Sequence, residues 1–344
     1  MHGIPAPLWR ILQIVSRSFG LSLGILPRSL RTSFALGYLL ARAADTIADT
    51  RILPQTERLD ALDRLRQAID APEDFSGLAP LVLAPQTQAE RQLLLHLPEC
   101  LHLLTTLPDQ DRARVRSVVL TLISGMAEDL RRFPGEDAQH LTALDTLDDL
   151  DRYTYFAAGC VGEFWTEMTM AHRLTYARWD AGQMRRLGVR FGQALQMTNV
   201  LRDLAHDLRI GRCYLPLAML GPVGLTPTDL LDPGTLGRLR PLLTALMELT
   251  LSHFDAAWAY TRAIPRREWR LRLACLWPLL IGLRTLAAIG RAENLLDPAV
   301  VIKISRSDVY AMMLESGVRL ASNAALDRRV HAWRERARSA AGLS

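Results

Sequence analysis

Apolar residues along the chain recur at steps of three and four positions, which is the period of an α-helix. This pattern predicts helices over residues 8–18, 30–49, 57–69, 90–105, 111–132, 147–173, 180–207, 235–261, 267–292 and 306–321. No stretch alternates apolar and polar residues as a half-buried strand does, and no segment repeats at a fixed length. The pattern therefore predicts an all-α protein.

Proline and glycine collect between the predicted helices, most clearly at 71–87, 133–140, 212–233 and 264–265. None of these breaks is long or flexible enough to be a linker between domains. We therefore expect a single all-helical domain over residues 1–344. Its core spans roughly residues 8–325, and a basic, frayed tail covers residues 326–344.

The composition is that of a globular protein, with 49% hydrophobic and 22% charged residues. No apolar run reaches the roughly 18 residues that a membrane-spanning helix needs, and the first ten residues lack the order of a secretory signal. The four cysteines form no CxxC pair, which favours a reducing compartment. We expect a cytoplasmic protein.

The formal net charge is +5, and 40 of the 41 basic residues are arginine. The exception is Lys303. Such a surplus suits nucleic acid, anionic membranes or phosphorylated small molecules, or reflects a general preference for arginine over lysine. The basic residues are scattered, with no helix-turn-helix, zinc or RNA-stacking motif, so we expect no nucleic-acid partner.

The first chemical signal is a pair of aspartates in the predicted helix 30–49. Asp45 and Asp49 are four residues apart, so they project from one helix face, and Tyr38 and Arg42 extend the same face. Two adjacent carboxylates repel each other unless a cation lies between them. Mg²⁺ prefers carboxylate oxygens together with water and phosphate oxygens. The pair therefore indicates half of a diphosphate site.

A second pair lies in the predicted helix 180–207. Gln196, Asn199, Asp203 and Asp207 share one face at steps of three, four and four. Four apolar neighbours lie on other faces and can pack into a core: Val200, Leu201, Leu204 and Leu208. A half-buried row of amides and carboxylates is costly to desolvate without a partner. A metal cluster with an anionic substrate would be that partner.

A single DxxxD on an arginine-rich helix is usually a solvated face with salt bridges. We expect that ordinary arrangement for the acids at 145, 148, 149 and 151. Two pairs, each accompanied on its own face by polar or aromatic groups, favour the metal site instead.

Several motifs resemble the squalene/phytoene synthase family, in the family's order and over most of the chain. They are Ser16-Arg17-Ser18-Phe19, Tyr38–Asp49, Gly125-Met126-Ala127-Glu128, Tyr153-Thr154-Tyr155 with Ala158-Gly159 and Gly162, and Gln196–Asp207 followed by Gly211-Arg212 and Tyr214-Leu215-Pro216. The resemblance implies an isoprenoid synthase fold, a helical bundle around a central cavity that the two acid-bearing helices face. It also implies that the small residues of the tyrosine motif let an isoprenoid chain lie close to the backbone.

The implied reaction joins two prenyl diphosphates, farnesyl or geranylgeranyl. The allylic C–O bond of one substrate ionises, and the double bond of the second attacks the cation to give a cyclopropylcarbinyl diphosphate. A second ionisation and rearrangement follow, and reduction to squalene needs NADPH. No GxGxxG fingerprint is present, and family members bind NADPH within the helical fold.

The resemblance assigns roles to individual residues. Catalytic roles fall on Tyr38, Asp45, Asp49, Tyr155, Asp203 and Asp207. Diphosphate binding falls on Ser16, Arg17, Ser18, Arg42, Gln196, Arg202 and Arg212. Mg²⁺, or Mn²⁺ in its place, would be held by Asp45, Asp49, Asn199, Asp203 and Asp207, and NADPH by Asn199, Lys303 and Arg306.

The chain departs from the eukaryotic squalene synthase pattern at three places: Ala48 and His206 stand where inner glutamates occur, and Phe156 replaces a tyrosine. The C-terminal segment favours squalene as the product. Cys275 and Pro278 followed by Val301, Lys303 and Arg306 are similar to the squalene synthase ending.

Other activities remain open. A dehydrosqualene or phytoene synthase, or a synthase that stops at presqualene diphosphate, would keep the same aspartates. A non-catalytic helical assembly factor is a further alternative, although such relatives tend to lose the metal-binding acids. Because substrate and product are apolar, we also expect a peripheral contact with the inner membrane surface.

Overall fold

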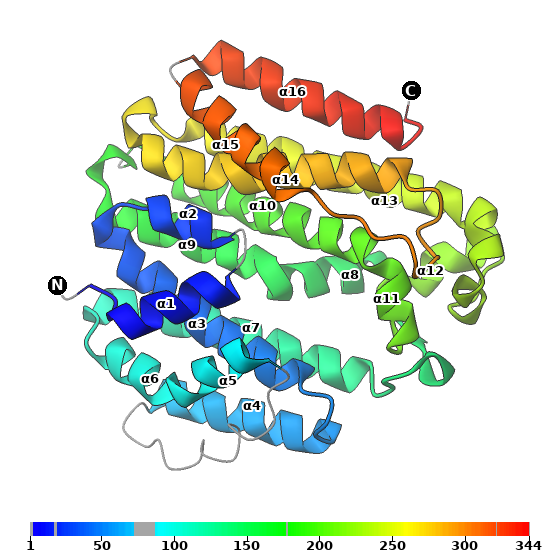
Figure 1. Ribbon diagram of the computed structural model, residues 1–344, viewed down its shortest axis with the longest axis horizontal. Helices are drawn as coiled ribbons and strands as arrows, with labels where there is room; N and C mark the ends of the chain where they lie inside the picture. The colour runs from blue at the N-terminus through cyan, green and yellow to red at the C-terminus, as the bar shows by residue number, and fades with distance from the viewer. Residues whose placement is uncertain (1–2, 17–18, 72–86, 177, 321, 344) are drawn as a thin grey trace. The chain divides into compact units, whose positions relative to one another are not determined.

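Figure 1 shows the computed structural model, which describes residues 3–16, 19–71, 87–176, 178–320 and 322–343. The chain divides into two compact units. Unit 1 comprises Met1–Arg132 and Glu163–Asp180, and unit 2 comprises Phe133–Gly162 and Ala181–Ser344. The single domain expected from the sequence stays a prediction.

Unit 1 is built around one long helix, α3, which contacts α1, α2, α4, α5, α6 and α7. Its helices are α1 (Ala6–Val15), α2 (Phe19–Ile25), α3 (Arg28–Asp49), α4 (Gln55–Asp70), α5 (Gln88–Leu95), α6 (Leu97–Thr105), α7 (Asp109–Arg132), and the part of α9 (Cys160–His172) from Glu163 onward, followed by the short η4 (Leu174–Tyr176). Phe34 of α3 packs against Phe164 and Trp165 of α9, with ring centroids 5.2 and 4.5 Å apart. These aromatic contacts form part of the core of unit 1.

Unit 2 is built around α10, which contacts α8, α13, α14 and the π-helical turn η3. Its first half contains η2 (Ala138–His140), β1 (Thr142–Ala143), α8 (Leu147–Thr154), η3 (Tyr155–Gly159), α10 (Ala181–Arg202), α11 (Leu204–Arg209) and β2 (Arg212–Cys213). Its second half contains α12 (Leu217–Leu220), η5 (Gly221–Val223), η6 (Thr228–Leu231), η7 (Pro233–Thr235), α13 (Leu236–Ala263), η8 (Arg266–Glu268), α14 (Trp269–Arg291), α15 (Arg306–Arg319) and α16 (Asn323–Ala340). The two short strands pair in parallel, Thr142 with Arg212.

The all-α fold is confirmed, and three predicted helices prove to be interrupted. The expected helix 90–105 is split between α5 and α6, next to Pro98. The expected helix 147–173 contains the π-helical turn η3. The expected helix 180–207 breaks at Asp203, whose φ of −96° and ψ of 8° leave the helical region.

The glycines of the tyrosine motif serve helix packing, which the sequence did not predict. A Cβ on Gly162 would lie 1.8 Å from the carbonyl oxygen of Gly188 in α10, and a Cβ on Gly159 would lie 3.2 Å from the Val189 side chain. Both glycines therefore let this segment approach the backbone of α10. The expected contact of this motif's small residues with an isoprenoid chain stays a prediction.

The expected frayed tail over residues 326–344 is also wrong, because most of it forms α16. Leu326, Val330 and Ala337 recur at helical spacing and are buried. Trp333 lies under three arginine guanidiniums, those of Arg284, Arg329 and Arg336, at 4.6 to 5.5 Å from its ring centroid. The arginines of this segment therefore stabilise a helix through cation–π contacts, and α16 packs on α13 and α14.

Among the described residues, one helical stretch, Arg266–Arg291, is long and apolar enough to cross a bilayer. Within the most apolar 18-residue segment of this stretch, 72% is buried inside the protein, as in the core helix of a globular protein.

Candidate active site

The first aspartate pair lies at the C-terminal end of α3, in unit 1. Arg42 Nη1 donates to the Asp45 carboxylate one helical turn later, and Arg42 Nη2 donates to Glu90 Oε1 of α5 at 2.9 Å. Asp49 is exposed and is the last residue of the helix. The guanidinium of Arg42 is therefore held between two carboxylates.

Burial first, and then the charge of Asp49, raise the pKa of Asp45 from its ordinary value of 3.8 to about 6, although Arg42 acts in the opposite direction. The side chain of Asp45 still exposes 40% of its surface, so a cation can reach it. A carboxylate that is hard to ionise beside a second carboxylate is stabilised by a bound positive charge.

Neighbouring helices fix this end of α3. Arg58 of α4 is fully buried, and its Nη1 donates to the backbone oxygen of Ala48 at 2.9 Å. The hydroxyl of Tyr38 donates to the backbone oxygen of Val15 at the end of α1, at 3.2 Å. These bonds hold the acid-bearing helix in place, and neither was predicted from the sequence.

Of the predicted serine and arginine segment, Ser16 lies just after α1 and its side chain is buried. Arg17 and Ser18 lie outside the described residues. Their predicted contact with a diphosphate stays a prediction.

The second aspartate pair lies where α10 passes into α11, in unit 2. Gln196, Asn199, Asp203 and Asp207 are all half-buried, and the four apolar neighbours expected to pack into the core are buried. The backbone N–H of Asp203 donates to the backbone oxygen of Asn199, and the backbone N–H of Asp207 donates to the backbone oxygen of Asp203, both at 2.9 Å. The four-residue spacing of the acids therefore survives the break at Asp203.

Asp203 accepts two hydrogen bonds from Arg202, from Nε at 2.8 Å and from Nη2 at 2.5 Å. This two-point contact raises the pKa of Arg202. The first acid of each pair is therefore bonded to an arginine from the same motif.

A row of polar groups continues from the second pair to the tyrosine motif. Asn199 Nδ2 donates to Gln196 Oε1 at 3.2 Å, and Gln196 Nε2 donates to the Tyr153 hydroxyl at 2.9 Å. The Tyr153 ring stacks on Tyr214, with centroids 4.2 Å apart. The structure thus joins three predicted motifs of unit 2, and Tyr153 is a site residue that the sequence analysis did not single out.

The predicted catalytic Tyr155 is half-buried in the π-helical turn, and its ring meets Phe156 edge-on at 5.6 Å. π-Helical turns are frequent at functional sites. Next to this turn, Gln193 Nε2 of α10 donates to Asp151 Oδ1 at 2.8 Å. Of the four acids expected on a solvated face, those at 145, 148 and 151 are exposed. The fourth, Asp149, is half-buried and completes the capping box of α8 with Thr146.

Arg212 is positioned by backbone geometry. Gly211 has a φ of +83°, which favours glycine, and a Cβ there would lie 2.6 Å from the Gly135 oxygen. This turn leads into β2, where Arg212 pairs with Thr142. Arg212 is half-buried at the start of the loop that follows the second acid pair.

The residues predicted to bind NADPH lie on two elements of unit 2. Lys303 is exposed in the segment before α15, and Arg306 is exposed in the first turn of that helix. Among the described residues, no hydrogen bond or ion pair connects either side chain to Asn199 on α10. Their role toward NADPH stays a prediction.

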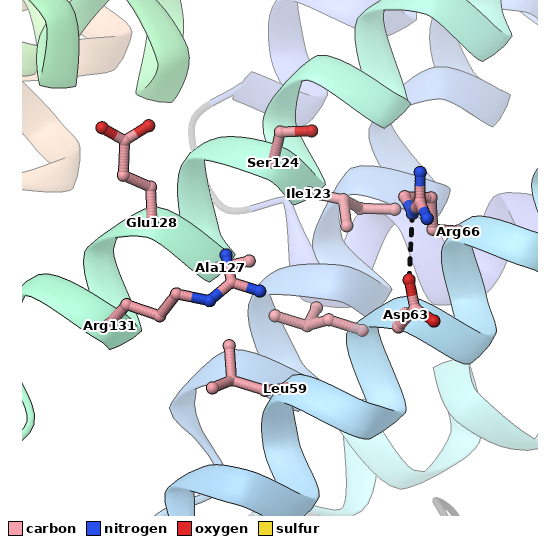
Figure 2. A pocket seen from close by; sticks show the side chains of 9 residues that line it. Leu59, Asp63, Arg66, Ile123, Ser124, Ala127, Glu128 and Arg131 are labelled. Carbon is pink, nitrogen blue, oxygen red and sulfur yellow. Dashed lines mark hydrogen bonds and ion pairs between the residues drawn. The ribbon is translucent and has the colours of Figure 1, made fainter.

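Two pockets of unit 1 lie away from the predicted site residues. One, of about 460 Å³, lies between α4 and α7 and includes Ala127 and Glu128 of the G-M-A-E element. Figure 2 shows this pocket, with the ion pair between Asp63 and Arg66 at one edge. The other, of about 1420 Å³, lies among α1, α3, α6 and α7 and is open to solvent.

Among the residues that the structure describes, no group of three or more histidine, cysteine or acidic side chains could hold a metal ion. Each aspartate pair offers two carboxylates, and Asn199 adds an amide oxygen. This oxygen-only set suits Mg²⁺, which keeps several waters and takes its other ligands from substrate phosphates.

Glu90, the glutamate that accepts a hydrogen bond from Arg42, was not predicted as a site residue. The sequence does contain a signal for the start of α5, because Thr87-x-x-Glu90 is a capping-box pattern.

A model of the Squalene/phytoene synthase family matches residues 12–308 of the chain. A squalene synthase of Eremothecium gossypii is 25% identical over 311 residues, which are 90% of this chain and 67% of that protein. A presqualene diphosphate synthase of Rhodopseudomonas palustris is 28% identical over 324 residues, 92% of this chain and 99% of that protein. A solved complex of TcSQS with the ligand E5700 has a TM-score of 0.72 at 21% identity and covers 97% of both chains, a likeness of fold alone. Because the family model spans more than half of its length, the chain belongs to the squalene/phytoene synthase family.

Proposed function

We propose that this chain condenses two molecules of farnesyl diphosphate head to head into presqualene diphosphate, and then converts that intermediate to squalene with NADPH. The observation that carries the proposal is the pair of acid motifs, each with its first aspartate bonded to an arginine of the same motif. The family is one of prenyltransferases.

The arginines and the acids would have different roles in the ionisation of the prenyl diphosphate. Arg42 and Arg202 lie beside the carboxylates, where they can donate hydrogen bonds to a leaving diphosphate as negative charge develops on it. Asp45 and Asp49 in unit 1, and Asn199, Asp203 and Asp207 in unit 2, would each hold Mg²⁺, which would supply positive charge to a leaving diphosphate.

Other side chains would position the substrates. The Gln196 amide is oriented by the Tyr153 hydroxyl, so its own oxygen faces Asn199. Tyr155 lies in the π-helical turn next to this row, where its hydroxyl would assist ionisation or move a proton.

A synthase that stops at presqualene diphosphate is the second candidate. The similarity to the presqualene diphosphate synthase covers 99% of that protein, but only 67% of the squalene synthase. This match over nearly the full length of the presqualene diphosphate synthase supports a chain that leaves the reduction to another enzyme.

The test is incubation of the full chain with farnesyl diphosphate and Mg²⁺, with and without NADPH, followed by product analysis. Squalene formed only with NADPH supports the main proposal. Presqualene diphosphate under both conditions supports the second candidate. Dehydrosqualene under both conditions, or phytoene from geranylgeranyl diphosphate, would overturn both.

A further inference from the structure

Helix α15 carries large apolar side chains on its outer face. Tyr310, Leu314 and Val318 follow one another at four-residue steps, and they expose 60%, 75% and 77% of their surfaces. These three residues, here called the α15 stripe, lie on one face of the helix because residues four apart are neighbours. Its inner face, with Met312 and Ser316 buried, packs on α14 and α16 (Figure 1). Helix α15 therefore exposes an apolar face to solvent.

The acidic side chains of α15 are paired with arginines. Asp308 accepts from Arg284 of α14 at 2.8 Å. Glu315 accepts from Arg319 at 3.0 Å and also from Arg329 of α16. These pairs neutralise the negative charge of the helix where it meets the rest of unit 2.

The charges next to the stripe are basic. Lys303 and Arg306 are both exposed at the N-terminal end of α15. Val301, two residues before Lys303, exposes 65% of its surface. Apolar side chains flanked by cations, with a tyrosine at their edge, are the features of a helix that lies in the plane of an anionic membrane surface.

We propose that the α15 stripe, together with Lys303 and Arg306, docks on an anionic phospholipid bilayer. A second copy of this chain fits less well, because a stable protein interface buries about 800 Å² on each partner, more than three side chains supply. A bilayer needs only a few inserted apolar groups and nearby cations. The proposal deepens the proposed function, since a membrane would receive the apolar product.

The test is flotation of the full chain with vesicles of phosphatidylcholine that contain phosphatidylglycerol, in the absence of substrate. The chain should float with these vesicles and much less with pure phosphatidylcholine, and added salt should weaken its binding. The double change Leu314→Asp and Val318→Asp should lower the partition coefficient at least about tenfold. Leu174→Asp is the matched control, because Leu174 exposes 96% of its surface in unit 1 and should leave flotation unchanged.

Equal flotation of the wild type and the double variant would overturn the proposal, as would absence of flotation or equal binding to both kinds of vesicle. A wild-type dimer that the double variant converts to a monomer, without flotation, would overturn it in favour of self-association. If the double variant does not fold, Lys303→Gln and Arg306→Gln carry the test, with a loss of about fivefold for each expected and no loss contradicting the proposal. Because no turnover is measured, failure here is distinguishable from failure of the proposed reaction.

Discussion

The guanidinium of Arg42 donates to the carboxylate of Glu90 at 2.9 Å and so ties the acid-bearing helix α3 to α5. Glu90 also completes the capping box of α5 with Thr87. One carboxylate therefore orders the start of α5 and holds an arginine beside the first aspartate pair.

Glu90→Gln should separate these two roles. Glutamine also completes a capping box, so the free energy of unfolding should change by less than about 1 kcal/mol. The charge that anchors Arg42 is lost, and kcat/KM for farnesyl diphosphate should fall about tenfold. Glu57→Gln is the matched control, since Glu57 holds the corresponding third position of α4 and is exposed. Steady-state kinetics that are the same for both variants would show that Glu90 does not position Arg42.

Gly162→Ala should destabilise the protein, because its new Cβ would lie 1.8 Å from the Gly188 oxygen, a backbone atom that cannot turn away. The expected loss in the free energy of unfolding is about 3 kcal/mol, measured by denaturant titration. Gly237→Ala in α13 is the control, because its Cβ meets nothing within 4 Å and should gain about 0.5 kcal/mol. A Gly162→Ala protein as stable as wild type would refute the close packing of this segment on α10.

His253 should make the stability depend on pH. Arg190 Nε donates to its Nδ1 at 3.3 Å, so the imidazole accepts that bond as a neutral ring. Burial and then the charge of Arg190 lower its pKa from 6.5 to about 4. Between these values the unfolded chain binds a proton that the folded chain does not. The free energy of unfolding should therefore fall as the pH drops through this window, by about 2–3 kcal/mol.

Denaturant titrations at pH 7 and pH 4.5 measure this effect. His253→Asn keeps an acceptor for Arg190 and removes the titration, so its stability should fall less over the same window. His331→Asn, at an exposed position of α16, should retain the wild-type dependence. The idea fails if His253→Asn loses as much stability on acidification as wild type does.

Tyr153→Phe should act on the second aspartate pair through Gln196. The Gln196 amide loses the hydroxyl that accepts its hydrogen bond at 2.9 Å, while the ring can still stack on Tyr214. We expect kcat to fall about tenfold and the free energy of unfolding by about 1 kcal/mol. Tyr310→Phe, at an exposed hydroxyl, is the control for kcat. An unchanged kcat in Tyr153→Phe would remove Tyr153 from the site.

The sequence predicted the long helices and the burial around the second acid pair because hydrophobic periodicity reports which face of a helix is covered. The C-terminal end of the predicted helix 30–49 agrees with α3, which ends at Asp49. The break at Asp203 was not predictable, since its neighbours continue the same periodicity and only the backbone angles change.

The features that the sequence did not predict depend on tertiary contacts between elements that are far apart in the chain. The arginines after residue 326 looked like a solvated tail, but they stack on Trp333 while Leu326 and Val330 are buried. Gly159 and Gly162 pack against α10, a tertiary neighbour that the motif itself does not report. Arg58, Glu90 and Tyr153 support the site from other elements, and no local pattern reports such partners.

The most direct test of the central claim measures the release of diphosphate from farnesyl diphosphate in the presence of Mg²⁺. Asp45→Asn and Asp203→Asn should each lower the rate at least about a thousandfold, with unchanged helical content by circular dichroism. Asp63→Asn, at the edge of the pocket between α4 and α7, should retain the wild-type rate. Diphosphate release at the wild-type rate by either Asp45→Asn or Asp203→Asn would contradict the assignment of the two aspartate pairs.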